Sequence, residues 1–152
     1  MFPMPVSGIR TSSARILIVD DNPSGLAARR SVLEELGHRV HTCASAPEAL
    51  EHCRKTPFDI VVTDYRMPDM DGSVFIQELR KTHPQTGVIM ISGFTDALGL
   101  NEASTGADVV IQKSAQEVGR LIRAVNRLSK KPPVKKPARA VGASVTDRRR
   151  RA

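Results

Sequence analysis

Five side chains in this sequence have the chemistry of a site that binds a divalent cation and receives a phosphoryl group: Asp20, Asp21, Asp64, Ser92 and Lys113. Three carboxylates held close together repel one another at neutral pH, and a hard cation such as Mg²⁺ would supply the missing counter-charge. A carboxylate can attack a phosphoryl group, while an ammonium, a hydroxyl and a metal neutralise the transferring oxygens. These residue types therefore favour phosphoryl transfer to a carboxylate, if the fold brings them together.

Short apolar runs, typical of buried strands, precede these side chains. The runs are 16–19, 58–63, 88–91 and 109–111, and a weaker edge-strand signal lies at 40–43. Helix-like segments separate the runs, and five strands that each precede a helix predict an α/β fold with a doubly wound, five-stranded parallel sheet covered by helices on both faces. In the flavodoxin-like order 2-1-3-4-5, strands one, three, four and five adjoin one crevice at their carboxyl ends, where the five side chains would meet.

Cap residues and apolar spacing predict where the helices lie and which faces they bury. Asn22 is expected to cap the first helix and Gly37 to end it, Ser45 to cap the second, and Ser114 with Glu117 to form a capping box on the last. Apolar residues at steps of three and four predict the buried faces. These are Leu26, Leu33 and Leu36 in the first helix, Phe75, Ile76 and Leu79 in the third, and Val118, Leu121, Ile122, Val125 and Leu128 in the last.

Composition separates a folded domain from the two ends of the chain. We expect a disordered N-terminal segment over 1–14, one domain over 15–128 and a disordered basic tail over 129–152. The tail contains nine Lys and Arg and a single acid, so its net charge is larger than the formal net charge of +7 of the whole chain. The rest of the chain, including the domain, is therefore close to neutral. No foldable sequence follows residue 128, which predicts a single-domain protein without an output domain.

The remaining sequence features predict a cytoplasmic protein. Cys43 and Cys53 have no metal-binding or disulfide pattern, which fits a reducing compartment. The N-terminal residues lack the basic and apolar regions of a signal peptide, and no later run is long and apolar enough to span a bilayer. Apart from Mg²⁺, no cofactor is expected.

Four motifs, in order, resemble the response-regulator receiver family of two-component systems. They are Ile-Leu-Ile-Val-Asp-Asp-Asn at 16–22, Asp-Tyr-Arg-Met-Pro-Asp-Met-Asp-Gly at 64–72, Ile-Ser-Gly-Phe at 91–94 and Gly-Ala-Asp at 106–108, followed by Lys113. The resemblance extends over about 15–128, and the joint spacing is far more specific than any single motif. It implies a phosphoacceptor domain that promotes only its own phosphorylation and dephosphorylation, and that is otherwise not an enzyme.

The resemblance implies a role for each acidic residue at the site. Asp64 resembles the phosphoacceptor, Asp21 the direct metal ligand, and Asp20 the neighbouring acid that acts largely through water. Arg66 resembles the position whose backbone carbonyl binds the metal. The implied cofactor is Mg²⁺, and the implied phosphoryl donors are a sensor histidine kinase, a phosphotransfer protein or a small molecule such as acetyl phosphate.

Ser92 and Lys113 resemble the hydroxyl and the ammonium that bond the phosphoryl group, but the sequence around Lys113 departs from the family pattern. Residues 109–111 are Val-Val-Ile where the family usually carries an aromatic residue, and Ser114 replaces the usual cis-proline. The segment between Ser92 and Lys113 is also a residue or two short. The departures leave the phosphorylation site complete and affect the expected signalling face.

Two alternatives remain open from the sequence. A phosphatase of the haloacid-dehalogenase type also uses a nucleophilic Asp and Mg²⁺, but its second acid would stand where Arg66 does. A receiver with a degraded switch could act as a constitutive binding module for a protein or a nucleic acid through the basic tail, which would make weak, non-specific contacts with phosphates. The downstream partner is not identified by either reading.

Overall fold

The structure is a computed structural model, and it describes residues 13–93 and 99–130. Strands and helices alternate along the chain, as the apolar runs predict. The strands are β1 (Arg15–Val19), β2 (Arg39–Cys43), β3 (Ile60–Asp64), β4 (Gly87–Ser92) and β5 (Val109–Gln112). The helices are α1 (Pro23–Glu35), α2 (Ala46–Lys55), α3 (Gly72–Thr82), α5 (Glu102–Thr105) and α6 (Glu117–Ser129).

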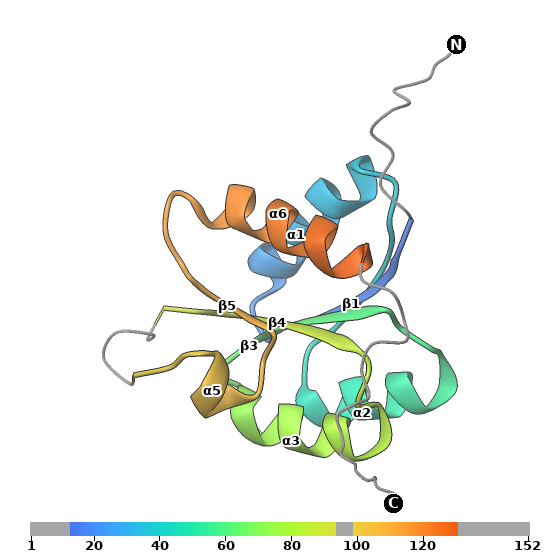
Figure 1. Cartoon of the computed structure of the whole chain (residues 1–152), viewed down its shortest axis with the longest axis vertical. Helices are drawn as coiled ribbons and strands as arrows, with labels where there is room; N and C mark the ends of the chain where they lie inside the picture. The colour runs from blue at the N-terminus through green and yellow to red at the C-terminus, as the bar shows by residue number, and fades with distance from the viewer. Residues whose placement is uncertain (1–12, 94–98, 131–152) are drawn as a thin grey trace, which may run out of the picture.

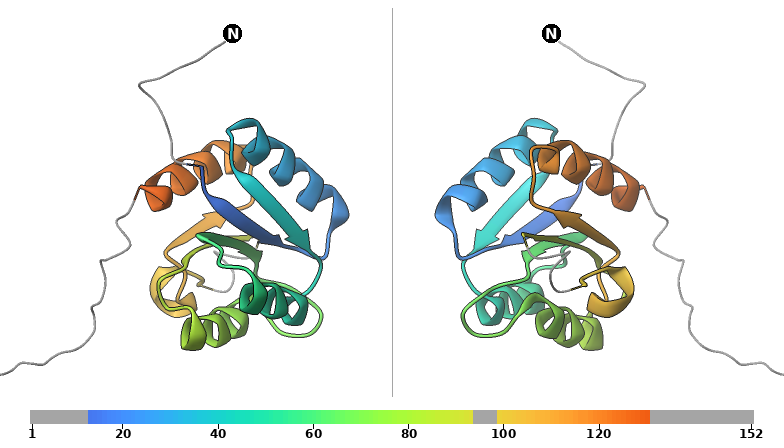
Figure 2. Two further views of the ribbon diagram at one scale, coloured as in Figure 1. Left: turned by 90° about the vertical axis from the view of Figure 1, so that its right-hand side faces the viewer. Right: turned by 90° about the vertical axis from the view of Figure 1, so that its left-hand side faces the viewer.

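The five strands form one parallel sheet in the order β2-β1-β3-β4-β5. Helices α1 and α6 cover one face of the sheet, and α2, α3 and α5 lie on the other (Figures 1 and 2). The predicted α/β fold with strand order 2-1-3-4-5 is therefore confirmed. Because all strands run the same way, their carboxyl ends lie along one edge, which is where the five candidate side chains were predicted to meet.

Alternation along each strand sends side chains into two cores, one on each face. In β1, Ile16 and Ile18 pack under α1 and α6, while Leu17 and Val19 pack under α2 and α3. All four are completely buried. The central strands are apolar on both faces, as expected of a parallel sheet between two helical layers.

Most of the predicted helix starts and buried faces are confirmed. The Asn22 side chain accepts hydrogen bonds from the first backbone N–H groups of α1, and the Ser45 hydroxyl accepts one from the N–H of Glu48. Gly37 follows α1 with a φ of 94°, a conformation that glycine adopts without a steric penalty. The predicted inward residues of α3, namely Phe75, Ile76 and Leu79, are buried.

Two predicted core residues are wrong, and each lies at an end of a helix. Leu36 is 42% exposed and Val118 is 45% exposed. Leu36 lies at the C-cap of α1, about one turn beyond Leu33, which is the last buried residue of the helix. Val118 lies in the first turn of α6, where the inward position is taken by its neighbour Glu117, whose carboxylate is paired with the buried Arg29.

The predicted capping box of Ser114 and Glu117 is also wrong. Helix α6 begins at Glu117, its N-cap is Gln116, and no side chain caps it. The Ser114 hydroxyl accepts a hydrogen bond from the Gln116 N–H instead. The Glu117 carboxylate is bound by Arg29 and is therefore not used as a cap.

The boundaries of the folded domain differ slightly from the prediction. Ala14 was assigned to a disordered segment, but it is buried and its carbonyl accepts a hydrogen bond from Arg39 N–H. Ser129 was assigned to the tail, but it is the last residue of α6. The predicted disorder of the remaining terminal residues falls on 1–12 and 131–152, outside the described residues. No helix within 13–93 and 99–130 is both long and apolar enough to cross a membrane.

Candidate functional site

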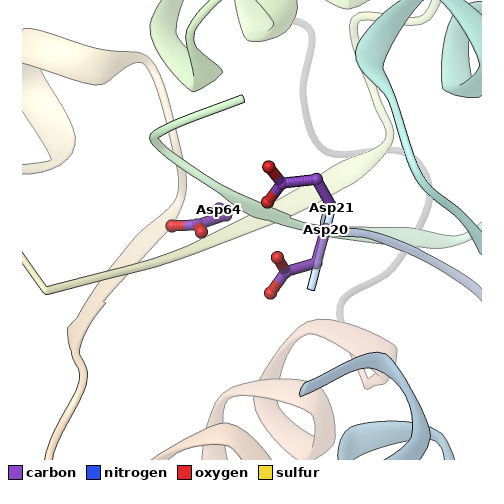
Figure 3. A group of neighbouring side chains, drawn as sticks. All are labelled: Asp20, Asp21 and Asp64. Carbon is purple, nitrogen blue, oxygen red and sulfur yellow. The ribbon is translucent and has the colours of Figure 1, made fainter. Parts of the chain in front are cut away.

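Three carboxylates meet at the carboxyl edge of the sheet (Figure 3). Asp20 and Asp21 directly follow β1, and Asp64 is the last residue of the neighbouring β3. One oxygen from each of the three side chains lies within 4.8 Å of the others. Asp20 and Asp64 are buried, while Asp21 is exposed. The predicted convergence of these acids is confirmed, and the exposed Asp21 gives the cluster contact with solvent.

Both oxygens of Asp64 accept hydrogen bonds. Oδ1 accepts from the Tyr65 backbone N–H at 2.7 Å, and Oδ2 accepts from Nζ of Lys113 at 3.2 Å. Burial raises the pKa of the Asp64 carboxyl, and the Lys113 ammonium opposes this shift while the negative charge of Asp20 adds to it. Lys113 and the Tyr65 N–H therefore favour the ionised carboxylate, which is the form that can attack an electrophile.

Ser92 and Lys113 reach the same edge from β4 and β5. Ser92 ends β4 and is completely buried, and Lys113 directly follows β5. The backbone N–H of Lys113 donates to the carbonyl of Ser92 at 2.9 Å, which continues the pairing of the two strands to this point. Lys113 is thereby held next to Asp64, as the strand order predicts. Phe94, the last residue of the third motif, lies outside the described residues.

The loop between β3 and α3 lines an open pocket next to Asp21. The pocket is lined by Asp21, Tyr65, Arg66, Met67, Pro68 and Asp71. Gly72 begins α3 and closes the loop, because its N–H donates to the carbonyl of Tyr65 at 2.7 Å. Arg66, predicted to offer its backbone carbonyl to a metal, lies in this loop. A ligand in the pocket would reach the Asp21 end of the acidic cluster from solvent.

Sequence reasoning missed one charged residue of the site, Arg29 of α1. Its Nη1 donates to Oδ2 of Asp20 at 2.7 Å, and its Nε donates to Oε2 of Glu117 at 2.9 Å. The signal was present in the sequence. Arg29 lies three residues after Leu26 and four before Leu33, on the face of α1 predicted to be buried. A charged residue on that face requires a buried partner.

The donor set fits a hard divalent cation. All three clustered side chains offer carboxylate oxygens, the ligand type that Mg²⁺ prefers, and no thiol or imidazole joins them among the described residues. Asp21 is exposed and could bind a metal that keeps several water ligands. The arrangement can therefore hold a small cation next to Asp64 and Lys113.

Comparisons with known proteins identify the family. The family model for the response regulator receiver domain matches residues 16–126. The chain is 40% identical over 88 residues to the sensor kinase CckA of Brucella abortus and 38% identical over 94 residues to the hydrogenase transcriptional regulatory protein HoxA of Cupriavidus necator. These matches cover 57% and 59% of this chain, but only 9% and 19% of those relatives.

Solved structures agree with this assignment. A CheY-like receiver domain protein from Methanospirillum hungatei is 29% identical, with a TM-score of 0.68 over 78% of this chain and 96% of that chain. The response regulator TrrA from Thermotoga maritima, solved in complex with Mg²⁺-BeF, is 28% identical, with a TM-score of 0.69 over 76% of this chain and 98% of that chain. The chain therefore belongs to the response regulator receiver domain family of two-component signal transduction.

Proposed function

We propose that this receiver accepts a phosphoryl group on Asp64, with Mg²⁺ held by the neighbouring carboxylates, and that it signals to a partner by a change of conformation. The observation that supports this most directly is the position of the Asp64 carboxylate, which lies 3.2 Å from the Lys113 ammonium and within the cluster formed with Asp20 and Asp21. The phosphoryl donor would be a histidine kinase, a phosphotransfer protein or a small acyl phosphate. Outside this self-modification, the domain has no catalytic activity of its own.

In the proposed reaction each residue has a task. An Asp64 oxygen attacks phosphorus, the new O–P bond forms, and the bond to the donor's nitrogen or acyl oxygen breaks. Lys113, already hydrogen-bonded to Asp64, exchanges that bond for one to a phosphoryl oxygen. The Ser92 hydroxyl also hydrogen-bonds the phosphoryl group. Asp21 and Asp64, with the Arg66 carbonyl, would hold Mg²⁺, and Asp20 would act on it through water; the bound ion would supply positive charge to the same oxygens.

Intact-mass analysis after incubation with acetyl phosphate and Mg²⁺ tests the proposal. The wild-type chain should gain one phosphoryl group, and Asp64→Asn should gain none. Asp69→Asn is the matched control, because it removes a carboxylate from the exposed loop that follows β3. Equal labelling of wild type and Asp64→Asn would overturn the assignment, whereas loss of labelling in Asp69→Asn would place the acceptor in the loop.

A second candidate function rests on the sequence of β5 and on the basic tail. Residues 109–111 carry no aromatic side chain, and the backbone N–H of Val110 donates to Glu102 of α5. A receiver in which phosphorylation of Asp64 does not change the surface around β5 and α5 would act as a constitutive binding module through its basic tail. The two candidates differ in one measurable property, since partner binding depends on phosphorylation of Asp64 only in the first. The family assignment and Arg66 both argue against the phosphatase alternative.

A further inference from the structure

Arg29 connects the acidic site to the start of α6. Helices α1 and α6 lie side by side on one face of the sheet (Figure 1), and Arg29 lies between them with only 7% of its surface exposed. One side of its guanidinium donates to Asp20 at 2.7 Å and the other donates to Glu117 at 2.9 Å. The bridge thus joins the carboxyl end of β1, the middle of α1 and the first turn of α6.

Each oxygen of the Asp20 carboxylate accepts one hydrogen bond. Oδ2 of Asp20 accepts from Arg29 at 2.7 Å, and Oδ1 accepts from the backbone N–H of Asn22 at 3.0 Å. The residue is 1% exposed, so water does not compete for these oxygens. A cation that bound Asp20 directly would share these oxygens with the two donors and would lie close to the positive charge of Arg29.

The bridge also changes the charge that a cation would meet. Asp20, Asp21 and Asp64 contribute three negative charges, and Lys113 and Arg29 contribute two positive charges within direct hydrogen-bond distance of Asp64 and Asp20 respectively. Glu117 offsets part of the Arg29 charge from the opposite side. Because Asp20, Asp64 and Arg29 are buried, their interactions are screened less than those of surface charges.

We propose that Arg29 is a positioning residue that competes with a metal for the Asp20 carboxylate, lowers the affinity of the acidic site for divalent cations, and is itself partly neutralised by Glu117 of α6. This proposal rests on the proposed function, since it concerns the metal that assists phosphorylation of Asp64. It makes the affinity of the site depend on a residue of α6. By linkage, a cation at the site and the attachment of α6 to Arg29 then influence each other.

The proposal predicts shifts of opposite sign. Arg29→Met removes a positive charge and releases Asp20, so Mg²⁺ should bind more tightly, by roughly three- to tenfold. Glu117→Gln leaves the Arg29 charge unopposed, so Mg²⁺ should bind more weakly, by roughly two- to fivefold. Arg29→Lys keeps the charge and should stay near the wild-type value. A purely structural bridge predicts that both disruptive variants loosen the site and weaken binding.

Isothermal titration calorimetry with MgCl₂, on the full chain at about pH 8, well above the usual carboxyl pKa range, measures these affinities. Tyr65 is the only tyrosine, the chain has no tryptophan, and Tyr65 adjoins Asp64, so tyrosine fluorescence reports binding at the same place. Arg30→Met and Glu34→Gln are matched controls, because Arg30 and Glu34 form an ion pair of 3.0 Å on the exposed side of α1. Neither control should change the affinity.

Tighter binding by Arg29→Met together with weaker binding by Glu117→Gln supports the proposal. Shifts of the same sign, or none, in the presence of normal wild-type binding overturn it and leave the phosphoacceptor function intact. If Arg29→Met does not fold, Arg29→Lys and Glu117→Gln decide the question, because a wild-type affinity in Glu117→Gln also overturns the proposal. A wild-type chain that binds no Mg²⁺ overturns the metal site and this inference together.

Discussion

Gly72 offers a direct test of how closely the backbone is packed around Asp64. A Cβ at this position would lie 2.6 Å from the carbonyl oxygen of Asp64, 2.8 Å from Cε of Met90 and 3.0 Å from Cα of Tyr65. Ordinary van der Waals contacts of a Cβ begin at 3.4 Å. The methionine methyl can rotate away, but two of the three neighbours are backbone atoms of the phosphoacceptor and the residue after it. Gly72→Ala therefore has to move the backbone at the end of β3.

The expected cost follows from the nature of these contacts. Overpacking a tight site by one methyl group costs about 1–3 kcal/mol, which corresponds to a melting temperature lower by roughly 4–15 °C for a domain of this size. The displaced backbone also carries the N–H that donates to Oδ1 of Asp64. We therefore expect a lower initial rate of phosphorylation by acetyl phosphate in addition to the loss of stability.

Thermal unfolding and intact-mass labelling of Gly72→Ala measure both effects. Gly119→Ala is the matched control, since it lies within α6 and its Cβ would meet nothing nearer than Nη1 of Arg123 at 3.7 Å. Alanine in place of a helical glycine should stabilise the protein by about 0.5–1 kcal/mol. If Gly72→Ala melts and is labelled like wild type, the backbone contacts of Gly72 do not constrain the site and the argument is refuted.

Three further predictions concern other parts of the chain. Asp21→Ala should weaken Mg²⁺ binding strongly in calorimetry, because it removes the exposed carboxylate of the cluster; an unchanged affinity would place the metal elsewhere. Burial lowers the pKa of His38, so the unfolded chain binds more protons and stability should fall as the pH drops below about 6.5. Urea unfolding should show this loss in wild type and in the control His52→Asn but not in His38→Asn, and equal pH dependence in all three would refute it. We expect weak DNA or RNA binding that Asp64→Asn retains and that deletion of 131–152 abolishes. If about five cations engage phosphates, the log of the binding constant should fall with the log of the salt concentration at a slope of roughly −3.5 to −4.5. Binding that does not change with salt would exclude this mechanism.

The sequence was sufficient to predict the sheet and the strand-end residues of the site. Each strand is a short apolar run, and the chemically important side chain comes directly after it, so its position depends only on where the strand ends. Asp64 illustrates this, since the run Ile-Val-Val-Thr places it at the edge of the sheet regardless of which helices cover the faces. Strand order then determines which ends are neighbours, and it brought Lys113 to Asp64 as expected.

Helix faces were less predictable because their burial depends on a partner element. Apolar spacing alone predicts that Leu36 and Val118 are buried, yet both lie at helix ends and are exposed. Arg29 lies on the same face of α1, but the spacing could not show that the carboxylates of Asp20, after β1, and of Glu117, in α6, would meet it there. Such a pair depends on residues 88 positions apart in the chain, which local patterns do not relate.

The Arg29 bridge also shows why the charge of the site could not be read from its motif. The motif supplies three carboxylates and one lysine, and on that basis the site has an excess of negative charge that a cation would neutralise. The folded chain adds the buried guanidinium of Arg29 at 2.7 Å from Asp20, so the protein itself neutralises part of that negative charge. A site with an internal positive charge binds a cation less tightly than the same site without it. Because Glu117 shares that guanidinium, the balance is set jointly by the sheet edge and by α6, and a change at either place reaches the other.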